Sequence, residues 1–352
     1  MDAAFKSIEG QPERDRRGNV CLFAHFDPDD VVDPYVHRYL ESIRLVGFDI
    51  VFISASKLSA AETAEVARYC DDVVLRENVG LDFGSWSDGY HRWKGRISGN
   101  LLLANDSVYG PLGDLAEALR RLTAQEGDFY GMVESLDVKP HVQSWFLLLK
   151  PHVYRHAAFA RVMAQDFAGM GKNDIIRVGE ISLSATLRAA GFRSRAMVES
   201  THLGTSWPFA KSNAAHYLWR ELIAIEKIPF MKVELLRDNP VGISQLHEWR
   251  TYVADRAPEL VPLIDNHLRR VTSNGSMRAD ADDIPARWWS IETFVRRQYK
   301  LSRSPVRRFI NIFFFFIMPV LPSVIRVLGF VRILPKRIFP KQLLPKRRVS
   351  GK

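Results

Sequence analysis

Residues 101–111, LLLANDSVYGP, run from an apolar stretch into an abrupt polar stop. The apolar part predicts a buried strand, because strands covered on both faces read as nearly continuous apolar runs. The strand then ends at Asp106, where a buried carboxylate without a partner would be costly. One interpretation is a turn or helix cap, since Asn, Asp and Ser at 105–107 all start turns and Gly-Pro follows at 110–111. The other is a ligand for a Mg²⁺ or Mn²⁺ ion that holds a diphosphate.

The segments around this stretch alternate between short apolar runs and amphipathic stretches, from residue 19 to about residue 200. Such alternation predicts a doubly wound, mostly parallel α/β sheet. The predicted strands cover residues 19–26, 49–55, 72–77, 100–105, 128–135 and 144–150. The predicted helices cover residues 32–47, 60–70 and 111–125. Sheets of this kind bind ligands beyond the carboxyl ends of their strands, so the polar end at 105–107 lies where a site is expected.

The remainder of the chain divides by composition. Residues 1–18 are a polar extension, 19–200 form the α/β domain, 201–300 are richer in helix and in aromatic residues, and 301–352 form a basic, apolar tail. Within 201–300 the clearest predicted helices are 216–225 and 260–271, which could cap the sheet and supply an acceptor site. The sequence contains no P-loop, G-x-G-x-x-G, G-x-S-x-G, H-E-x-x-H or EF-hand pattern.

The positive charge is concentrated at one end of the chain. The net charge is +9, and residues 301–352 hold twelve Lys or Arg and no Asp or Glu, so the tail carries +12 and residues 1–300 carry −3. A protein that binds duplex nucleic acid is expected to carry its basic patch on the folded body. We therefore expect no nucleic acid among the partners.

The tail has the composition of a segment that associates with a membrane. Residues 309–325 are seventeen uncharged residues that include Pro319 and Pro322, just short of the roughly 20 that a spanning helix needs. Pro-Lys pairs then recur at 335/336, 340/341 and 345/346, and cations among apolar residues are attracted to an anionic leaflet. We expect peripheral or monotopic attachment, with a spanning segment or a solvated charged tail as the alternatives.

Two further observations concern the compartment. Cys21 and Cys70 are the only cysteines, and without a nearby Cys or His at metal-ligand spacing they are expected to be reduced thiols in the core, which suits a cytosolic compartment. The N-terminus lacks the apolar segment of a secretory signal, so we expect the body to stay on the side where it is made.

A second segment, RENVGLDFGSWSDGY at 76–90, directly precedes the strand at 100–105. Gly80 and Gly84 would let the backbone approach a ligand, and Asp82 between them could accept hydrogen bonds from a base or a sugar. With this pair of motifs the sequence resembles the rhamnan synthesis protein F family, glycosyltransferases of bacterial surface polysaccharide assembly with a GT-A-like fold.

The resemblance covers roughly residues 19–265. It rests on FAHFD (23–27), NVGLDFGSW (78–86), NDSVYGP (105–111), HVQSWFLLLK (141–150), the Glu180-x-x-Leu183 stretch that ends at Gly191, and IPFMKVELLRDNP (228–240). It implies transfer of a sugar, in known members often rhamnose, from a nucleotide diphosphate donor to a lipid-linked glycan such as a lipopolysaccharide precursor.

The resemblance also implies roles for individual residues. Asp106 matches the position of the Asp-x-Asp metal motif of GT-A enzymes, but Asn105 and Ser107 flank it here, so that metal dependence is open. The residues that the resemblance assigns to donor, nucleotide or acceptor contacts are His25, Asp27, Asn78, Gly80, Asp82, Asn105, His141, Gln143, Ser144 and Trp145. The Trp145 indole would suit stacking on a sugar face.

Glu180 is the candidate catalytic base, because inverting transfer needs a carboxylate to take the proton of the acceptor hydroxyl; the alternative is an acid at a helix N-terminus. His202 is a candidate third metal ligand or phosphate contact, and the alternative is a structural histidine. Lys232 and Arg237 could hold the diphosphate without a metal, unless they belong to a solvated helix face.

The sequence therefore predicts a membrane-associated glycosyltransferase at the cytoplasmic face of the inner membrane. Its partners would be a nucleotide diphosphate sugar, a polyprenyl-linked glycan acceptor and the anionic membrane surface contacted by 301–352. The alternatives are a non-catalytic scaffold of a polysaccharide assembly complex and a metal-dependent phosphotransferase acting on phospho-sugars.

Overall fold

The computed structural model describes residues 18–136, 138–199, 213–272, 292, 295 and 296. The chain divides into two compact units, Met1–Tyr299 and Lys300–Lys352, and all described residues belong to the first. Within these residues no helix is long and apolar enough to span a bilayer.

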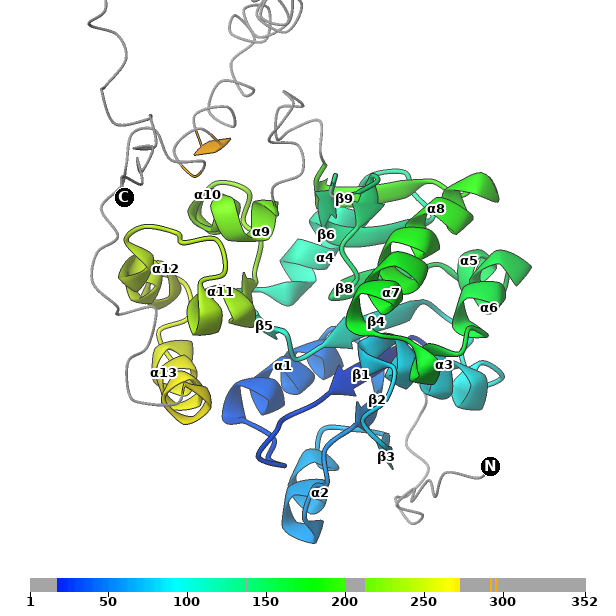
Figure 1. The fold of residues 1–352 in the computed structure, drawn as a ribbon, viewed down its shortest axis with the longest axis horizontal. Helices are drawn as coiled ribbons and strands as arrows, with labels where there is room; N and C mark the ends of the chain where they lie inside the picture. The colour runs from blue at the N-terminus through cyan, green and yellow to red at the C-terminus, as the bar shows by residue number, and fades with distance from the viewer. Residues whose placement is uncertain (1–17, 137, 200–212, 273–291, 293–294, 297–352) are drawn as a thin grey trace, which may run out of the picture. The chain divides into compact units, whose positions relative to one another are not determined.

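The first unit is built on a mixed sheet of mostly parallel strands, which confirms the predicted α/β class (Figure 1). The strand order among the described residues is β3-β2-β1-β4-β8-β6-β7, and β9 pairs with β6. Strands β1 to β4 are mutually parallel, while β8 runs antiparallel to both β4 and β6. The bounds are β1 Val20–His25, β2 Asp49–Ser54, β3 Asp72–Leu75, β4 Leu101–Asn105, β6 Phe129–Ser135, β7 His141–Val142, β8 Phe146–Leu149 and β9 Ser194–Val198.

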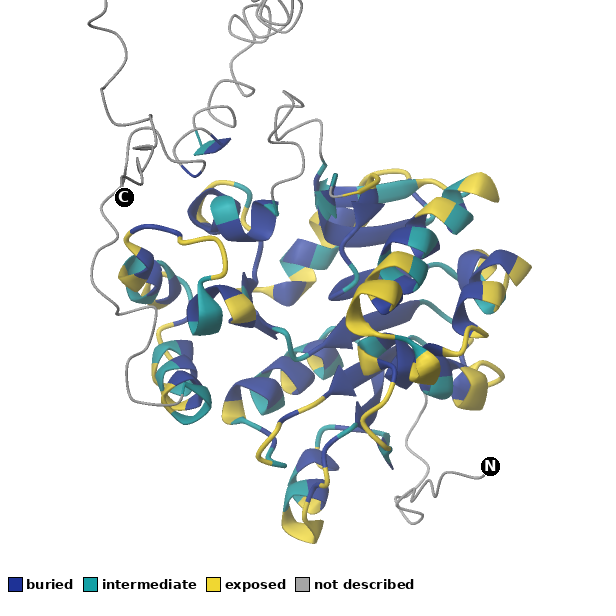
Figure 2. Cartoon of the chain, in the orientation of Figure 1, coloured by how far each residue is buried: buried dark blue, intermediate teal, exposed yellow. Residues whose placement is uncertain are grey.

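The two faces of the sheet are buried by different helices, and alternate strand residues point to each. In β1, Cys21 and Phe23 belong to one apolar core, and Val20, Leu22 and Ala24 belong to the other. The first core is completed by α1 (Pro34–Leu45), α4 (Leu115–Thr123) and the C-terminal helices, the second by α3 (Leu81–Trp93), α5 (Pro151–Tyr154), α6 (Ala157–Met163) and α8 (Ser182–Ala189). Figure 2 shows that the strands are buried and that the exposed positions lie on the outer sides of helices and in loops.

Helix α3 was not among the predicted helices, although it contains the 81–90 part of the glycine-containing segment. Gly80 precedes it in a left-handed conformation with φ +75°. Gly and Ser have low helix propensity, but the helix buries Phe83, Trp86, Tyr90 and Trp93 against the sheet. Tertiary burial therefore outweighs local propensity here.

The chain beyond residue 212 folds back onto the sheet edge that carries the polar strand end. A two-stranded ribbon pairs β10 (Met231–Lys232) with β5 (Val108–Tyr109), which lies directly after residues 105–107. The helices around it are α9 (Ala214–Tyr217), α10 (Trp219–Ala224), α11 (Val233–Asp238), α12 (Trp249–Ala254) and α13 (Leu260–Val271). The predicted helix at 216–225 is thus interrupted at Leu218, whereas the one at 260–271 is confirmed.

Candidate functional site

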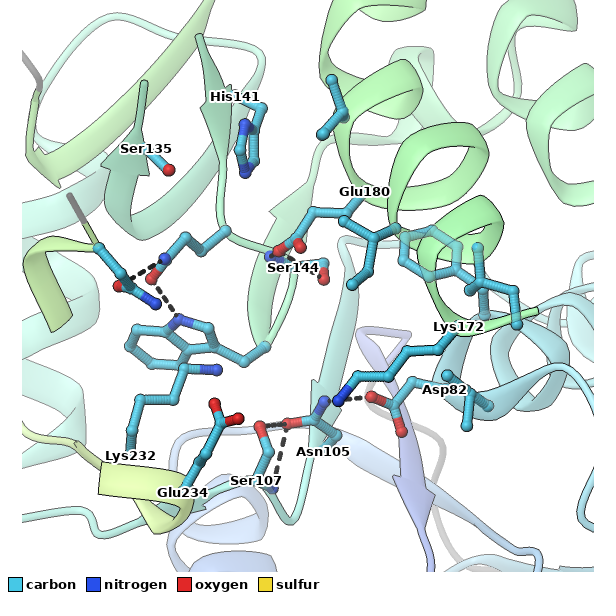
Figure 3. Close-up of a pocket in the computed structure, with 18 of the residues that line it drawn as sticks. Asp82, Asn105, Ser107, Ser135, His141, Ser144, Lys172, Glu180, Lys232 and Glu234 are labelled. Atoms are coloured by element: carbon cyan, nitrogen blue, oxygen red, sulfur yellow. Dashed lines mark hydrogen bonds between the residues drawn. The ribbon is translucent and has the colours of Figure 1, made fainter. Parts of the chain in front are cut away.

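A pocket of about 440 Å³ lies beyond the carboxyl end of β4, and we call it the central pocket. Its walls come from the start of α3, from β7 and the loop to β8, from the π-helix Ile176–Ile181, and from β10 and α11. Figure 3 shows the charged side chains of Asp82, Glu180, Lys232 and Glu234 around it. Segments far apart in the sequence therefore bring acids and cations together at the sheet edge where ligands are expected.

Two of the sequence motifs meet in this pocket through a short chain of hydrogen bonds. The Asn105 side-chain amide donates to Asp82 Oδ2 at 2.7 Å, and the Ser107 hydroxyl donates to Asn105 Oδ1 at 2.7 Å. Burial raises the pKa of Asp82, as does nearby Glu180, against the opposing effects of Asn105 and Lys232. Asn105 therefore orients and partly satisfies a carboxylate whose charged form is disfavoured by its surroundings.

The other predicted residues of the 78–84 motif do not line the central pocket. Asn78 is exposed, and a Cβ on Gly80 would come within 2.9 Å of the Phe167 Cβ. A Cβ on Gly84, which lies inside α3, would come within 2.6 Å of the Val79 carbonyl oxygen. In the structure these two glycines permit a close approach of the chain to itself, and the predicted approach to a ligand stays a prediction.

Glu180 lies on the π-helix, a rare element that recurs at functional sites. Its Oε1 accepts hydrogen bonds from the Ser144 backbone N–H at 2.7 Å and from the Ser144 hydroxyl at 3.0 Å. Both donors come from the loop between β7 and β8, so the carboxylate is fixed at the pocket wall by a neighbouring segment that also lines the pocket. The alternative of an acid capping a helix N-terminus does not describe this geometry.

The 141–145 segment forms a packed wall of the pocket. The Trp145 indole N–H donates to Gln143 Oε1 at 2.9 Å, and the Gln143 amide donates to Asn213 Oδ1 at 3.1 Å. Trp145 is only 4% exposed, and Lys232 Nζ lies 5.4 Å from the centre of its ring. The indole therefore offers no open face for a sugar. His141 is also buried, with Nδ1 2.8 Å from the Lys139 carbonyl oxygen.

A second pocket of about 340 Å³, here the β1-side pocket, shares Ser107, Glu234 and Arg237 with the first. Asp106 lines this pocket, and its Oδ2 accepts a 2.9 Å hydrogen bond from the Phe26 backbone N–H. Burial, with Asp82 nearby, raises the pKa of Asp106 well above its usual value. Two successive residues at the end of β4 thus line two adjoining pockets, because Asn105 lines the central pocket and Asp106 lines the β1-side pocket.

His25 and Asp27, predicted at the nucleotide end, also line the β1-side pocket. His25 Nδ1 lies 2.9 Å from Ser54 Oγ, and Nε2 lies 3.9 Å from Asp106 Oδ2. Burial lowers the pKa of His25 to about 4, so its imidazole is neutral at pH 7 and can donate one hydrogen bond and accept another.

One group of side chains in the described residues has the spacing of a metal site, namely Asp27, Asp33 and His267. The Arg270 guanidinium already lies among them, with Nη1 3.0 Å from Asp27 Oδ1 and Nη2 paired with both Asp27 and Asp33. Against the effect of burial, these carboxylates raise the pKa of Arg270, so it stays charged. A divalent ion does not fit this group while Arg270 neutralises it.

Asp106 belongs to no group of three potential metal ligands among the described residues, although His25 Nε2 lies 3.9 Å from its Oδ2, and the same Oδ2 already accepts the Phe26 N–H. The other predicted metal ligand, His202, lies outside the described residues. At the strand end the described residues therefore supply fewer than three protein ligands of this kind, so a Mg²⁺ or Mn²⁺ ion held there would also need oxygens of the bound diphosphate.

The sequence-based prediction missed Arg270, Asp33 and His267. Arg270 reaches Asp27 across 243 positions, and no local pattern encodes a contact of that range. The only available signal was that His267 and Arg270 lie one helical turn apart on the predicted helix at 260–271.

Comparisons with known proteins agree with the family resemblance that the motifs at 78–86 and 105–111 indicate. The sequence profile of the family described as Rhamnan synthesis protein F matches residues 50–277. The virulence protein VirA of Vibrio anguillarum is 27% identical over 267 residues, covering 66% of this chain and 84% of VirA. The uncharacterized protein y4gN of Sinorhizobium fredii is 26% identical over 159 residues, covering 44% of this chain and 42% of that protein.

Solved structures share only a distant likeness. The glycosyltransferase GlyE of Streptococcus pneumoniae is 11% identical with a TM-score of 0.35, covering 72% of this chain and 64% of GlyE. A cytidylyltransferase from Leptospira borgpetersenii is 10% identical with a TM-score of 0.31, covering 50% of this chain and 74% of that one. At these TM-scores the likeness carries no argument about function.

Proposed function

The chain belongs to the rhamnan synthesis protein F family, and from this membership and the two adjoining pockets we propose that it is a glycosyltransferase. In this proposal a nucleotide diphosphate sugar lies across both pockets, with the nucleotide in the β1-side pocket and the sugar in the central pocket. Family membership supports a transferase that uses a nucleotide sugar, and rhamnose is the sugar that we propose.

The observation that carries the proposal is the position of Glu180. Two hydrogen bonds from Ser144 fix its carboxylate in the pocket that also contains Asp82 and Lys232. A fixed carboxylate can take the proton of an acceptor hydroxyl as that oxygen attacks the anomeric carbon of the donor. The nucleoside diphosphate then leaves, and a nearby cation stabilises its negative charge.

Asp82, which lines the same pocket as Glu180, would also contact the sugar. Its Oδ2 is engaged by Asn105, and no described residue donates a hydrogen bond to its Oδ1. That oxygen can accept a hydrogen bond from a sugar hydroxyl without any rearrangement. His25 and Asp27 would border the nucleotide, as their place in the β1-side pocket suggests.

The acceptor and the location complete the proposal. The acceptor would be a polyprenyl-linked glycan of a bacterial surface polysaccharide, and residues 301–352 would hold the enzyme at the cytoplasmic face of the inner membrane. The support for both is the composition of the tail, with twelve cations, no acids and a seventeen-residue uncharged segment.

A binding experiment with the full chain tests the donor half of the proposal. Melting of the protein would be followed against UDP, GDP, dTDP and their sugar conjugates, because a ligand that binds only the native state raises the melting temperature. We expect one nucleotide and its sugar conjugate to raise it, and Asp82→Ala to reduce the additional shift given by the sugar. If none of these compounds shifts the melt, the scaffold alternative replaces the enzyme.

A further inference from the structure

The pairing of β10 with β5 positions Lys232 at the central pocket. In the β5–β10 ribbon Lys232 is the register partner of Val108, and the Val233 N–H donates to the Ser107 carbonyl oxygen at 2.9 Å. The backbone of Lys232 is therefore tied to the segment that directly follows Asn105 and Asp106. This is the place where the Asn-Asp-Ser motif predicts a divalent ion.

The Lys232 ammonium is held without a carboxylate partner. It lies 5.4 Å from the centre of the Trp145 ring, a cation–π distance, and no described acid comes within 4.0 Å of it to form an ion pair. Burial lowers the pKa of Lys232, and the nearby acids Glu180, Asp82 and Glu234 oppose that effect without forming an ion pair with it. Lys232 is partly buried, and an ammonium that lines a pocket without an ion-pair partner can bind an anion there.

The other two cations that line the pocket, Arg237 and Lys172, differ from Lys232 in their pairing or exposure. The Arg237 guanidinium bonds to Asp238 through Nη2 at 2.7 Å and through Nε at 3.0 Å, so its charge is already paired. Lys172 is exposed, and water solvates its charge. Among the pocket cations that the structure describes, Lys232 is therefore the one that has no ion pair to a described acid and is less exposed to solvent than Lys172.

We infer that Lys232 binds the diphosphate of the donor in place of a divalent ion, so that donor binding is independent of metal. This inference rests on the proposed function. Lys232 stabilises the leaving nucleoside diphosphate as the bond from the anomeric carbon to the diphosphate oxygen breaks. The electron pair stays on that oxygen, and the acceptor proton passes to Glu180. Trp145 fixes the ammonium for this contact, which explains why an indole in the pocket wall is covered by a lysine.

Calorimetric titration of the full chain with UDP, GDP and dTDP, in Mg²⁺ and in EDTA, tests the inference. We expect the nucleotide that binds to do so with the same Kd in both solutions. Lys232→Met keeps the aliphatic stem on Trp145 and should weaken binding by about 10- to 100-fold, the loss of one charged hydrogen bond. Lys232→Arg should restore most of the affinity. The matched control is Lys150→Met, because the Lys150 ammonium lies 5.6 Å from the centre of the Tyr130 ring and outside both pockets, and this variant should bind like the wild type.

The outcomes separate the inference from the proposed function. Binding that disappears in EDTA while Lys232→Met binds like the wild type overturns the role of Lys232 and leaves the glycosyltransferase proposal standing. If the wild type binds none of the three nucleotides, the proposed function fails and the inference fails with it. The EDTA comparison uses the wild type alone, so it remains decisive if Lys232→Met does not fold.

Discussion

The side-chain amide of Asn105 donates a 2.7 Å hydrogen bond to the carboxylate of Asp82. Asn105 is the last residue of β4, and Asp82 lies in the first turn of α3. This bond joins the two motifs on which the family resemblance depends. It also gives a physical reason for an amide at a position where the Asp-x-Asp motif would have an acid, because a second carboxylate here would face Asp82 at hydrogen-bond distance.

The first prediction concerns Asn105→Asp. Two carboxylates in contact cannot both be ionised without a large cost, so at pH 7.5 we expect the free energy of unfolding to fall by about 1–3 kcal/mol. At pH 5 a shared proton should restore much of the loss. Denaturant titrations at both pH values measure this, with Asn105→Ala as the control that lacks the second charge. An equal loss at both pH values would mean that Asp82 and residue 105 do not interact as described.

The second prediction concerns Glu180→Gln. The Gln side-chain oxygen can still accept the two Ser144 hydrogen bonds, so we expect the melting temperature to be unchanged. The amide cannot take a proton, and removal of a general base lowers kcat by about 10²- to 10⁴-fold while donor affinity is kept. Steady-state kinetics with a saturating donor measures kcat. Loss of donor affinity with little change in kcat would assign Glu180 to binding rather than to proton transfer.

The third prediction concerns Arg270→Met. The substitution leaves buried Asp27 and partly buried Asp33 without their cation, and we expect a loss of about 2–4 kcal/mol in the free energy of unfolding. The freed Asp27, Asp33 and His267 side chains have metal spacing, so Mn²⁺ should raise the melting temperature of this variant more than that of the wild type. Arg269→Met, one residue away on the exposed side of α13, is the control. Equal Mn²⁺ responses would contradict the view that Arg270 takes the place of an ion.

The fourth prediction concerns pH and His267. Burial, and then Arg270, lowers the pKa of His267 to about 4, whereas the unfolded chain has a histidine pKa of about 6.5. Between these values the unfolded chain binds a proton that the folded chain does not. The stability contributed by neutral His267 is therefore complete above pH 6.5 and is lost as the pH falls towards 4, at up to about 1.4 kcal/mol per pH unit.

His267→Gln tests this direction of the pH dependence, because glutamine does not titrate. Glutamine can still accept a hydrogen bond from the Tyr109 hydroxyl, which lies 2.7 Å from His267 Nδ1. Denaturant titrations from about pH 7.5 down to pH 4.5 should show a shallower fall in stability for the variant than for the wild type. Parallel curves for the two proteins would show that His267 titrates normally in the folded state.

The sheet was predictable from sequence because its strands are continuous apolar runs with clear ends. The predicted strands at 19–26, 49–55 and 100–105 correspond to Val20–His25, Asp49–Ser54 and Leu101–Asn105. In parallel strands buried on both faces, hydrophobicity alone marks the element. Helix α3 was not predicted because its glycines and serines are typical of a loop. Its buried aromatic residues nevertheless follow helical spacing, namely Phe83, Trp86, Tyr90 and Trp93.

The candidate site was only partly predictable. Residues at strand ends, such as His25 and Asp106, could be placed because the α/β topology brings the carboxyl ends of parallel strands to one edge. Lys232 was a candidate contact of the diphosphate, but its position over Trp145 could not be predicted, and Arg270 was missed because its contact with Asp27 leaves no local pattern. The burial of the Trp145 ring could not be predicted either, since the lysine that covers it lies 87 positions along the chain.

The most direct test of the central claim is transfer of labelled sugar by the full chain. The nucleotide sugar that binds would be supplied with a lipid-linked glycan fraction, and label in the lipid-linked product would be measured for the wild type and for Glu180→Gln. We expect transfer by the wild type and near-complete loss in the variant, although both bind the donor. Equal transfer by the two proteins, or donor binding with no transfer by the wild type, would contradict it.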